Sequence, residues 1–144
     1  MSALKDFYTY AQEEGIQIMA YPIGFRSAAS LRLRGRRATF LDFGQIRTIP
    51  ELNWAVAHES GHHHLGAYHK VASPYQLWQQ AEYRADRWAF ESYLPADQIA
   101  EAMQKGYTEP WQLAEYFDLP EAAIKKALHY WTECRGVDFN RLEL

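Results

Sequence analysis

The sequence has a single cysteine, Cys134, among its 144 residues. One cysteine excludes a disulfide framework and a cysteine-based metal site within the chain, and it fits a reducing compartment. Long apolar runs are also missing at the N-terminus, because Met1 to Glu14 mixes charged and aromatic residues. This stretch has neither the apolar core of a signal peptide nor the length of a membrane span. We therefore expect a cytoplasmic protein that does not enter a membrane.

An excess of basic residues is missing as well. The formal net charge is −3, which gives no general attraction to nucleic acid or to an anionic membrane surface. The sequence does have 48% hydrophobic and 15% aromatic residues, enough to bury one sizeable core. We expect a single compact domain over residues 1–144, in which residues 95–144 form a C-terminal helical subregion.

Hydrophobic spacing in the first third of the chain predicts one helix and a small sheet. Apolar residues at i, i+3, i+4 and i+7 predict a helix over Ala3–Glu14, with Gly15 placed to end it. Alternating residues predict strands near 16–20, 31–34 and 38–43. The last two strands form a predicted hairpin that contributes to an antiparallel sheet.

The rest of the chain predicts helices, which makes the expected fold class α+β. One helix begins at residue 48 or 49, next to a proline and a glutamate, and continues to residue 65. A second long helix covers about 74–93, with Ser73 as its cap. Shorter helices are predicted at 96–104 and within 108–131.

The first long helix carries the motif His58, Glu59, Ser60, Gly61, His62. Residues four apart lie one turn apart on the same face of a helix, so His58 and His62 can direct two imidazole nitrogens at one point. This geometry suits Zn²⁺. Glu59 lies between the two histidines, near enough to reach a water on the metal, and is therefore placed as a general base.

Three neighbours of the motif carry further expectations. A glycine inside a helix costs about 1 kcal/mol relative to alanine, so Gly61 predicts that another segment packs closely against this position. His63 and His64 lie about 100° and 200° further round the helix than His62, so they cannot all serve one ion. We expect both on the surface or in support of the ligands.

Two histidines alone would hold zinc weakly, so the motif requires a third ligand. Glu82 and Asp86 are four apart on the second long helix, beside the small residues Ala85 and Ala89, which would allow the two helices to approach closely. We assign Glu82 as the third ligand. Asp86 is assigned as the acceptor for the non-ligating N–H of a zinc histidine, His58.

Other interpretations of these carboxylates remain open. They could form a solvated acidic face paired with Arg84 or Arg87. If Glu82 were not the ligand, the candidates would be Asp86, His69 and Glu91. His69 is one residue out of register with the extended three-histidine form of the motif.

Two segments within Asn53–Pro95, AVAHESGHHHLG and AEYRADRWAFESYLP, resemble the ImmA/IrrE family of metallopeptidases. The first contains the HExxH helix. The second contains a glutamate, an alanine followed by an aspartate, an aromatic residue, an alanine and a terminal Leu-Pro. These are Glu82, Ala85, Asp86, Trp88, Ala89, Leu94 and Pro95.

The resemblance implies a zincin-like metallopeptidase core, in which a Zn²⁺ cofactor is held by His58, His62 and Glu82 and in which Glu59 is the catalytic acid/base. Members of the family commonly accompany phages or mobile elements and cleave a partner repressor. We therefore expect a zinc-dependent endopeptidase whose substrate is a repressor or another transcription regulator. The alternative is a non-proteolytic, zinc-containing module that docks on a transcription regulator or a toxin partner.

An arginine-rich segment between Arg26 and Arg47 has six arginines against one acid, Asp42. Such a segment could form an edge strand that receives an extended acidic peptide beside the zinc. We favour the simpler interpretation, a solvated hairpin face whose arginines discourage edge pairing.

The segment from Tyr107 to Trp131 resembles a helix-turn-helix, with Leu119 and Pro120 at the turn. Its four acidic residues outnumber its two lysines, and this charge repels phosphate. We interpret the segment as a packing or partner-docking unit and do not expect it to bind nucleic acid directly.

Overall fold

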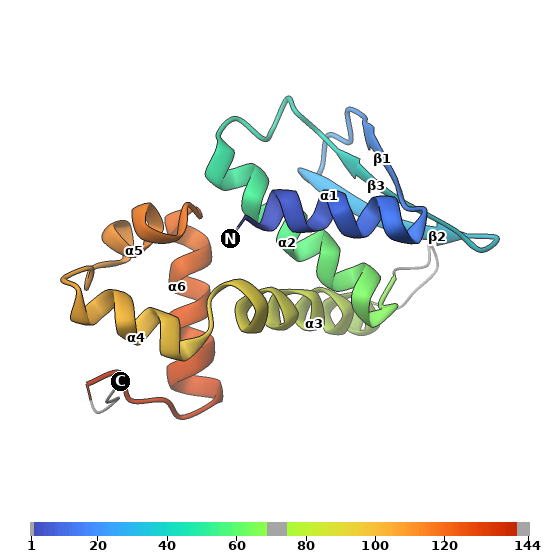
Figure 1. Ribbon diagram of the computed structural model, residues 1–144. Helices are drawn as coiled ribbons and strands as arrows, with labels where there is room; N and C mark the ends of the chain where they lie inside the picture. The colour runs from blue at the N-terminus through green and yellow to red at the C-terminus, as the bar shows by residue number, and fades with distance from the viewer. Residues whose placement is uncertain (1, 69–74, 141–144) are drawn as a thin grey trace. The chain divides into compact units, whose positions relative to one another are not determined.

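The structure is a computed structural model that describes residues 2–68 and 75–140 (Figure 1). The chain divides into two compact units, Met1–Ala89 and Phe90–Leu144. The first unit contains α1 (Ala3–Glu14), β1 (Gln17–Ala20), β2 (Ala28–Leu33), β3 (Arg36–Leu41), α2 (Ile49–Leu65) and most of α3 (Tyr75–Tyr93). The predicted α+β class is confirmed, and the predicted cap Ser73 lies outside the described residues.

The three strands form one mixed sheet in the order β1-β3-β2. β2 and β3 pair antiparallel, as predicted, whereas β1 pairs parallel to β3. The prediction of an antiparallel sheet is therefore wrong for β1. After β1 the chain first forms the far edge strand, and the hairpin then returns β3 to the centre, where it runs in the same direction as β1. Alternating hydrophobicity identifies a strand, but it does not determine the direction of the partner.

Local capping groups set the ends of α1 and α2, and the predicted end of the first helix at Gly15 is confirmed. The Ser2 side chain accepts a hydrogen bond from the Lys5 N–H at the start of α1, and Gly15 ends this helix in the left-handed conformation with φ of 71°. At the start of α2 the Thr48 side chain accepts the Glu51 N–H at 3.2 Å. Gly66, with φ of 63°, ends the helix and turns the chain back towards it.

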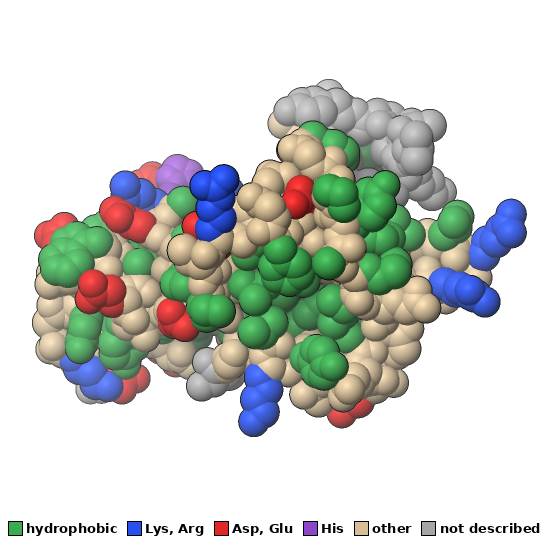
Figure 2. All heavy atoms as spheres, turned by 90° about the horizontal axis from the view of Figure 1, so that it is seen from above, with side chains coloured by type: hydrophobic (Ala, Val, Ile, Leu, Met, Phe, Trp, Pro, Cys, Tyr) green, Lys and Arg blue, Asp and Glu red, His purple; other side chains and the backbone are tan. Residues whose placement is uncertain are grey.

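Helices α1 and α2 lie on one side of the sheet (Figure 1). Phe7 of α1 and Val56 of α2 are fully buried, and Thr39 of β3 points inward to the same helix layer, where it contacts His63 of α2. Because side chains alternate along a strand, the neighbours of these inward residues point outward. Exposed apolar residues on the outer side include Met19, Tyr21, Leu31 and Leu33. Figure 2 shows hydrophobic side chains gathered on this side of the first unit.

A close approach between α2 and α3 fixes the relation of the two helices that carry the predicted ligands. A Cβ atom built on Gly61 would lie 2.7 Å from the Ala85 carbonyl oxygen, which is closer than atoms can pack. Ala81, Ala85 and Ala89 are all buried along this side of α3. The prediction that Gly61 permits close packing is confirmed.

The second unit is built from helices, as predicted for this part of the chain. It contains the end of α3, then α4 (Ala96–Gln104), α5 (Pro110–Phe117), α6 (Glu121–His129) and a π-helical turn over Tyr130–Cys134. Its core includes Leu94, Ile99, Leu113 and Ile124. None of the helices in the described part of the chain combines the length and the apolar character that crossing a membrane requires.

Candidate metal centre

His58 is held between two carboxylates that come from α3. Its Nδ1–H donates to Asp86 Oδ1 at 2.7 Å, and its Nε2–H donates to Glu82 Oε2 at 2.5 Å. Burial opposes a charge on this imidazole, but the hydrogen bonds to Asp86 and Glu82 outweigh it and raise the pKa of His58 to about 10. The predicted contact between Asp86 and His58 is confirmed.

His62 is fixed by the backbone that follows its own helix. Its Nδ1–H donates to the Ala67 carbonyl oxygen at 2.6 Å, so Nε2 is the ring nitrogen that faces the cluster. Gly66 makes this bond possible, because its left-handed turn brings Ala67 back beside the last turn of α2. The side chain is 2% exposed, and Nε2 lies 3.4 Å from Glu82 Oε1 and 3.2 Å from His58 Nε2.

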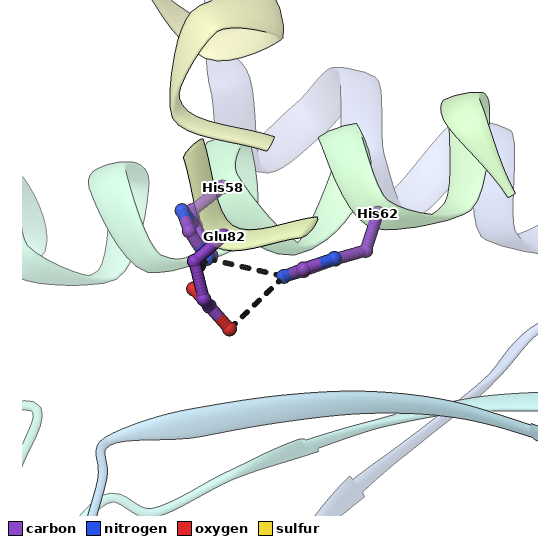
Figure 3. Close-up of side chains that lie close together, drawn as sticks. All are labelled: His58, His62 and Glu82. Atoms are coloured by element: carbon purple, nitrogen blue, oxygen red, sulfur yellow. Dashed lines mark hydrogen bonds and ion pairs between the residues drawn. The ribbon is translucent and has the colours of Figure 1, made fainter. Parts of the chain in front are cut away.

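The three predicted ligands converge on one point. His58 and His62 extend from successive turns of α2, and Glu82 reaches them from α3 (Figure 3). One ligand atom from each residue lies within 4.8 Å of the ligand atoms of the other two. His58, His62 and Glu82 therefore lie close enough to bind a metal ion together.

Glu59 lies beside this cluster, and its carboxylate is buried. Its side chain is 2% exposed, and Oε2 is 4.0 Å from His58 Nε2. Among the described residues, Oε1 has no hydrogen-bond partner. A buried carboxylate oxygen without a partner is costly, and such groups in native proteins usually serve a bound water, an ion or a reaction. The structure thus places an unsatisfied carboxylate oxygen next to the cluster of His58, His62 and Glu82.

Arg26 is a component of the site that the sequence did not predict. It lies in the loop between β1 and β2, and its Nη2–H donates to Glu82 Oε1 at 2.9 Å. The predicted alternative partners of the carboxylates, Arg84 and Arg87, are exposed residues of α3. Arg26 and Glu82 are 56 positions apart in the sequence, which explains why no spacing rule finds this pair. In the sequence, Arg26 is recognisable only as one of the six arginines of the arginine-rich segment.

Among the described residues, the cluster contains His58, His62 and Glu82 and not the alternative candidate Glu91. Glu91 belongs to the second unit, where its Oε1 accepts a hydrogen bond from the Tyr130 hydroxyl at 2.8 Å. His69 lies outside the described residues.

His63 faces the sheet and not the solvent, so the expectation for this residue is wrong. Its ring is 3% exposed and lies between the hydroxyls of Thr39 and Tyr68, with both ring nitrogens at 2.6 Å from an oxygen. Burial, together with the positive charge of Arg37, lowers the pKa of His63 to about 4. The physical reason is that this position of α2 faces β3, where a hydroxyl is available as a partner.

His64 is exposed, as expected. Its ring stacks on Tyr10 with centroids 3.9 Å apart and on Trp88 with centroids 4.5 Å apart. Of the three consecutive histidines at the end of α2, only His62 therefore joins the cluster with His58 and Glu82.

Comparisons of the chain with models of known protein families, with curated protein sequences and with solved structures give no significant match.

Proposed function

We propose that this chain is a zinc-dependent endopeptidase that cleaves a partner regulatory protein, in the manner of the ImmA/IrrE metallopeptidases that its motifs resemble. The observation that carries the proposal is the convergence of His58, His62 and Glu82 beside the unsatisfied carboxylate of Glu59. Glu59 directly follows one ligand in the chain, so the same turn of α2 supplies a ligand and a candidate acid/base.

The donor set fits zinc. Two imidazole nitrogens and one carboxylate oxygen are a common ligand set of catalytic Zn²⁺ sites, and three protein ligands leave the fourth position free. A bound zinc ion supplies a Lewis acid that polarises a peptide carbonyl and lowers the pKa of water to about 7. The hydrogen bonds from Nδ1 of both histidines favour this use, because Nε2 is then the nitrogen of each ring that faces the cluster, where a bound ion would replace the proton on His58 Nε2.

Glu59 performs the proton transfers in this proposal. Its carboxylate takes a proton from the water that attacks the peptide carbonyl and returns the proton to the leaving nitrogen. Its buried position supports this role, since water is largely excluded and Oε1 has no competing donor among the described residues. The zincin-like character of the core and the phage or mobile-element origin belong to the same proposal, and both rest on the resemblance of the two motif segments.

The substrate class also rests on that resemblance. A repressor or another transcription regulator is the proposed substrate, and the partner can be identified because Glu59→Gln is expected to bind it without cutting it. Once identified, this partner is purified and incubated with the wild-type chain, with Glu59→Gln and with the exposed control Glu13→Gln.

The wild type and the Glu13→Gln control are expected to produce discrete fragments that a chelator suppresses. Glu59→Gln is expected to retain zinc while cleavage falls by about 10²–10⁴-fold, the usual contribution of general acid–base catalysis. A stable complex of the wild type with its partner, without fragments, would contradict the peptidase and favour the non-proteolytic binding module.

A further inference from the structure

The ion pair between Arg26 and Glu82 joins the loop after β1 to the helix that supplies the third ligand. Arg26 Nη2 lies 2.9 Å from Glu82 Oε1, and the two side chains are 22% and 17% exposed. The other carboxylate oxygen, Oε2, is the one that contacts His58 Nε2. The guanidinium therefore holds one oxygen of the carboxylate while the second oxygen faces a histidine of the cluster.

Both ends of Arg26 are anchored. The guanidinium lies over the Trp78 ring, with 5.7 Å between Cζ and the ring centroid. At the other end, the Arg26 carbonyl oxygen accepts a hydrogen bond from Gln45 Nε2 at 3.0 Å. An exposed ion pair between two mobile side chains contributes little, but here the cation is held at its backbone and at its tip.

Gln45, which holds the Arg26 backbone, is itself hydrogen-bonded to Asp42 at the end of β3. Gln45 Nε2 also donates to Asp42 Oδ2 at 2.8 Å, and the Asp42 carboxylate accepts the backbone N–H groups of Gly24 and Gly44. The hydrogen bond from Gln45, followed by the one from Gly24, lowers the pKa of Asp42, so this carboxylate stays ionised. Asp42 thus ties the end of β3 to the loop that carries Arg26.

We propose that Arg26 is a positioning residue for the metal-binding carboxylate of Glu82. Its guanidinium engages Oε1 and so fixes the rotation of the carboxylate, which leaves Oε2 on the side of His58. This inference rests on the proposed metal site. Groups that orient a metal ligand typically change metal affinity by about 10–100-fold when they are lost.

The competing interpretation is a structural ion pair that only links the loop to α3. The two roles differ in what they affect. A structural pair changes the free energy of unfolding of the metal-free protein, whereas a positioning residue changes the affinity of the site and the ligand field at the ion.

The Arg26→Lys substitution separates the two roles. Lysine keeps the positive charge near the site, but it lacks the planar fork that stacks on Trp78 and donates to the carboxylate. Arg36→Lys is the matched control, because Arg36 is an exposed residue of β3 in the same arginine-rich segment. Zinc affinity is measured for the full chain by competition with a chromophoric chelator. The visible absorption spectrum of the Co²⁺-loaded protein then reports on the ligand field.

Arg26→Lys is expected to bind zinc about 10-fold more weakly than Arg36→Lys and to show an altered Co²⁺ spectrum. Equal zinc affinities of the two variants would overturn the inference, even if Arg26→Lys lowers the stability of the metal-free protein. A weaker affinity with an unchanged Co²⁺ spectrum would overturn it too, because the carboxylate would then not have moved.

Failure of the metal site itself gives a different result. Glu82→Gln is included in the same titration, and it is expected to lose zinc affinity whatever the role of Arg26. Equal zinc binding by the wild type and Glu82→Gln would contradict the proposed site. A loss of binding in Glu82→Gln, together with equal affinities of the two arginine variants, would contradict only the role of Arg26.

Discussion

The two sides of helix α2 use histidine in opposite ways. On the side that faces α3, His58 lies between two carboxylates, and the pKa of its imidazole is raised to about 10. On the side that faces the sheet, His63 lies between two hydroxyls, and burial lowers the pKa of its imidazole to about 4. These residues are five positions apart on one helix.

The difference comes from the neighbouring segments and not from the helix. α3 supplies Asp86 and Glu82, which favour a positive charge at the site, whether a proton or a metal ion carries it. β3 supplies Thr39, whose hydroxyl can satisfy a neutral ring but offers no charge. Whether a histidine is a candidate ligand or a neutral buried residue depends on the partners on its side of the helix.

The largest expected effect that tests this comparison is on zinc affinity. His62→Gln removes a proposed ligand, and the affinity is expected to fall by more than the roughly 10–100-fold that loss of a supporting group costs. His63→Gln changes the adjacent residue, and the affinity is expected to stay within a few-fold of the wild type. Chelator competition measures both. Comparable losses in the two variants would show that the sides of α2 are not functionally distinct.

A smaller effect concerns the pH dependence of stability in the metal-free protein. His63 is neutral in both states above a pH of about 6.5, the ordinary pKa of the unfolded chain. As the pH falls from there to about 4, only the unfolded state takes up the proton, so the free energy of unfolding falls, by about 3 kcal/mol in total. His58 is protonated in the folded state throughout this range, because its pKa is raised to about 10. Its unfolded form takes up a proton at a pH of about 6.5, and this contribution is the same in the wild type and in a variant that changes only His63.

The measurement compares chemical denaturation of the wild type and His63→Gln at about pH 7 and about pH 4.5, with chelator present. The partners that face His63 are Thr39 and Tyr68, and the neighbouring groups whose positive charge, where they carry one, opposes its protonation are Arg37, His62 and His64. His63→Gln leaves these groups in place. The wild type is therefore expected to lose more stability on acidification, and equal losses would contradict a neutral, buried His63.

The smallest expected effect concerns the close contact between Gly61 of α2 and Ala85 of α3. Gly61→Ala adds a methyl group at 2.7 Å from the Ala85 carbonyl oxygen. Overpacking of this kind costs about 1–3 kcal/mol, which outweighs the gain of up to about 1 kcal/mol in helix propensity. Thermal denaturation of the metal-free protein is expected to show a lower melting temperature, together with weaker zinc binding as α3 moves away. Glu13→Ala, on the exposed side of α1, is the control, and a stabilised Gly61→Ala would contradict the close contact.

Several features of the site follow from short-range rules and were predictable. The four-residue spacing of His58 and His62 places them on one face wherever a helix forms, and the caps at Thr48 and Gly66 determine that it forms there. The interior glycine Gly61 indicated a close neighbour before that neighbour was known. These rules depend only on residues within a few positions of one another, so the sequence alone is sufficient for them.

Other features depend on segments that meet only in the folded chain. The direction of β1, the hydroxyl partners of His63 and the pairing of Arg26 with Glu82 each join residues that are far apart in sequence. No periodic pattern encodes such pairs, because the free energy of each contact depends on packing that brings both partners together.

The sequence by itself determined the helices, the spacing of the two histidines and the carboxylate that is the third candidate ligand. Only the tertiary structure decided that His63 lies between two hydroxyls and is neutral, and which arginine holds Glu82. The physical reason is that residue type and helix geometry set what a side chain is able to do. Burial and partner charge, which arise only when α2 meets α3 and the sheet, set what it does.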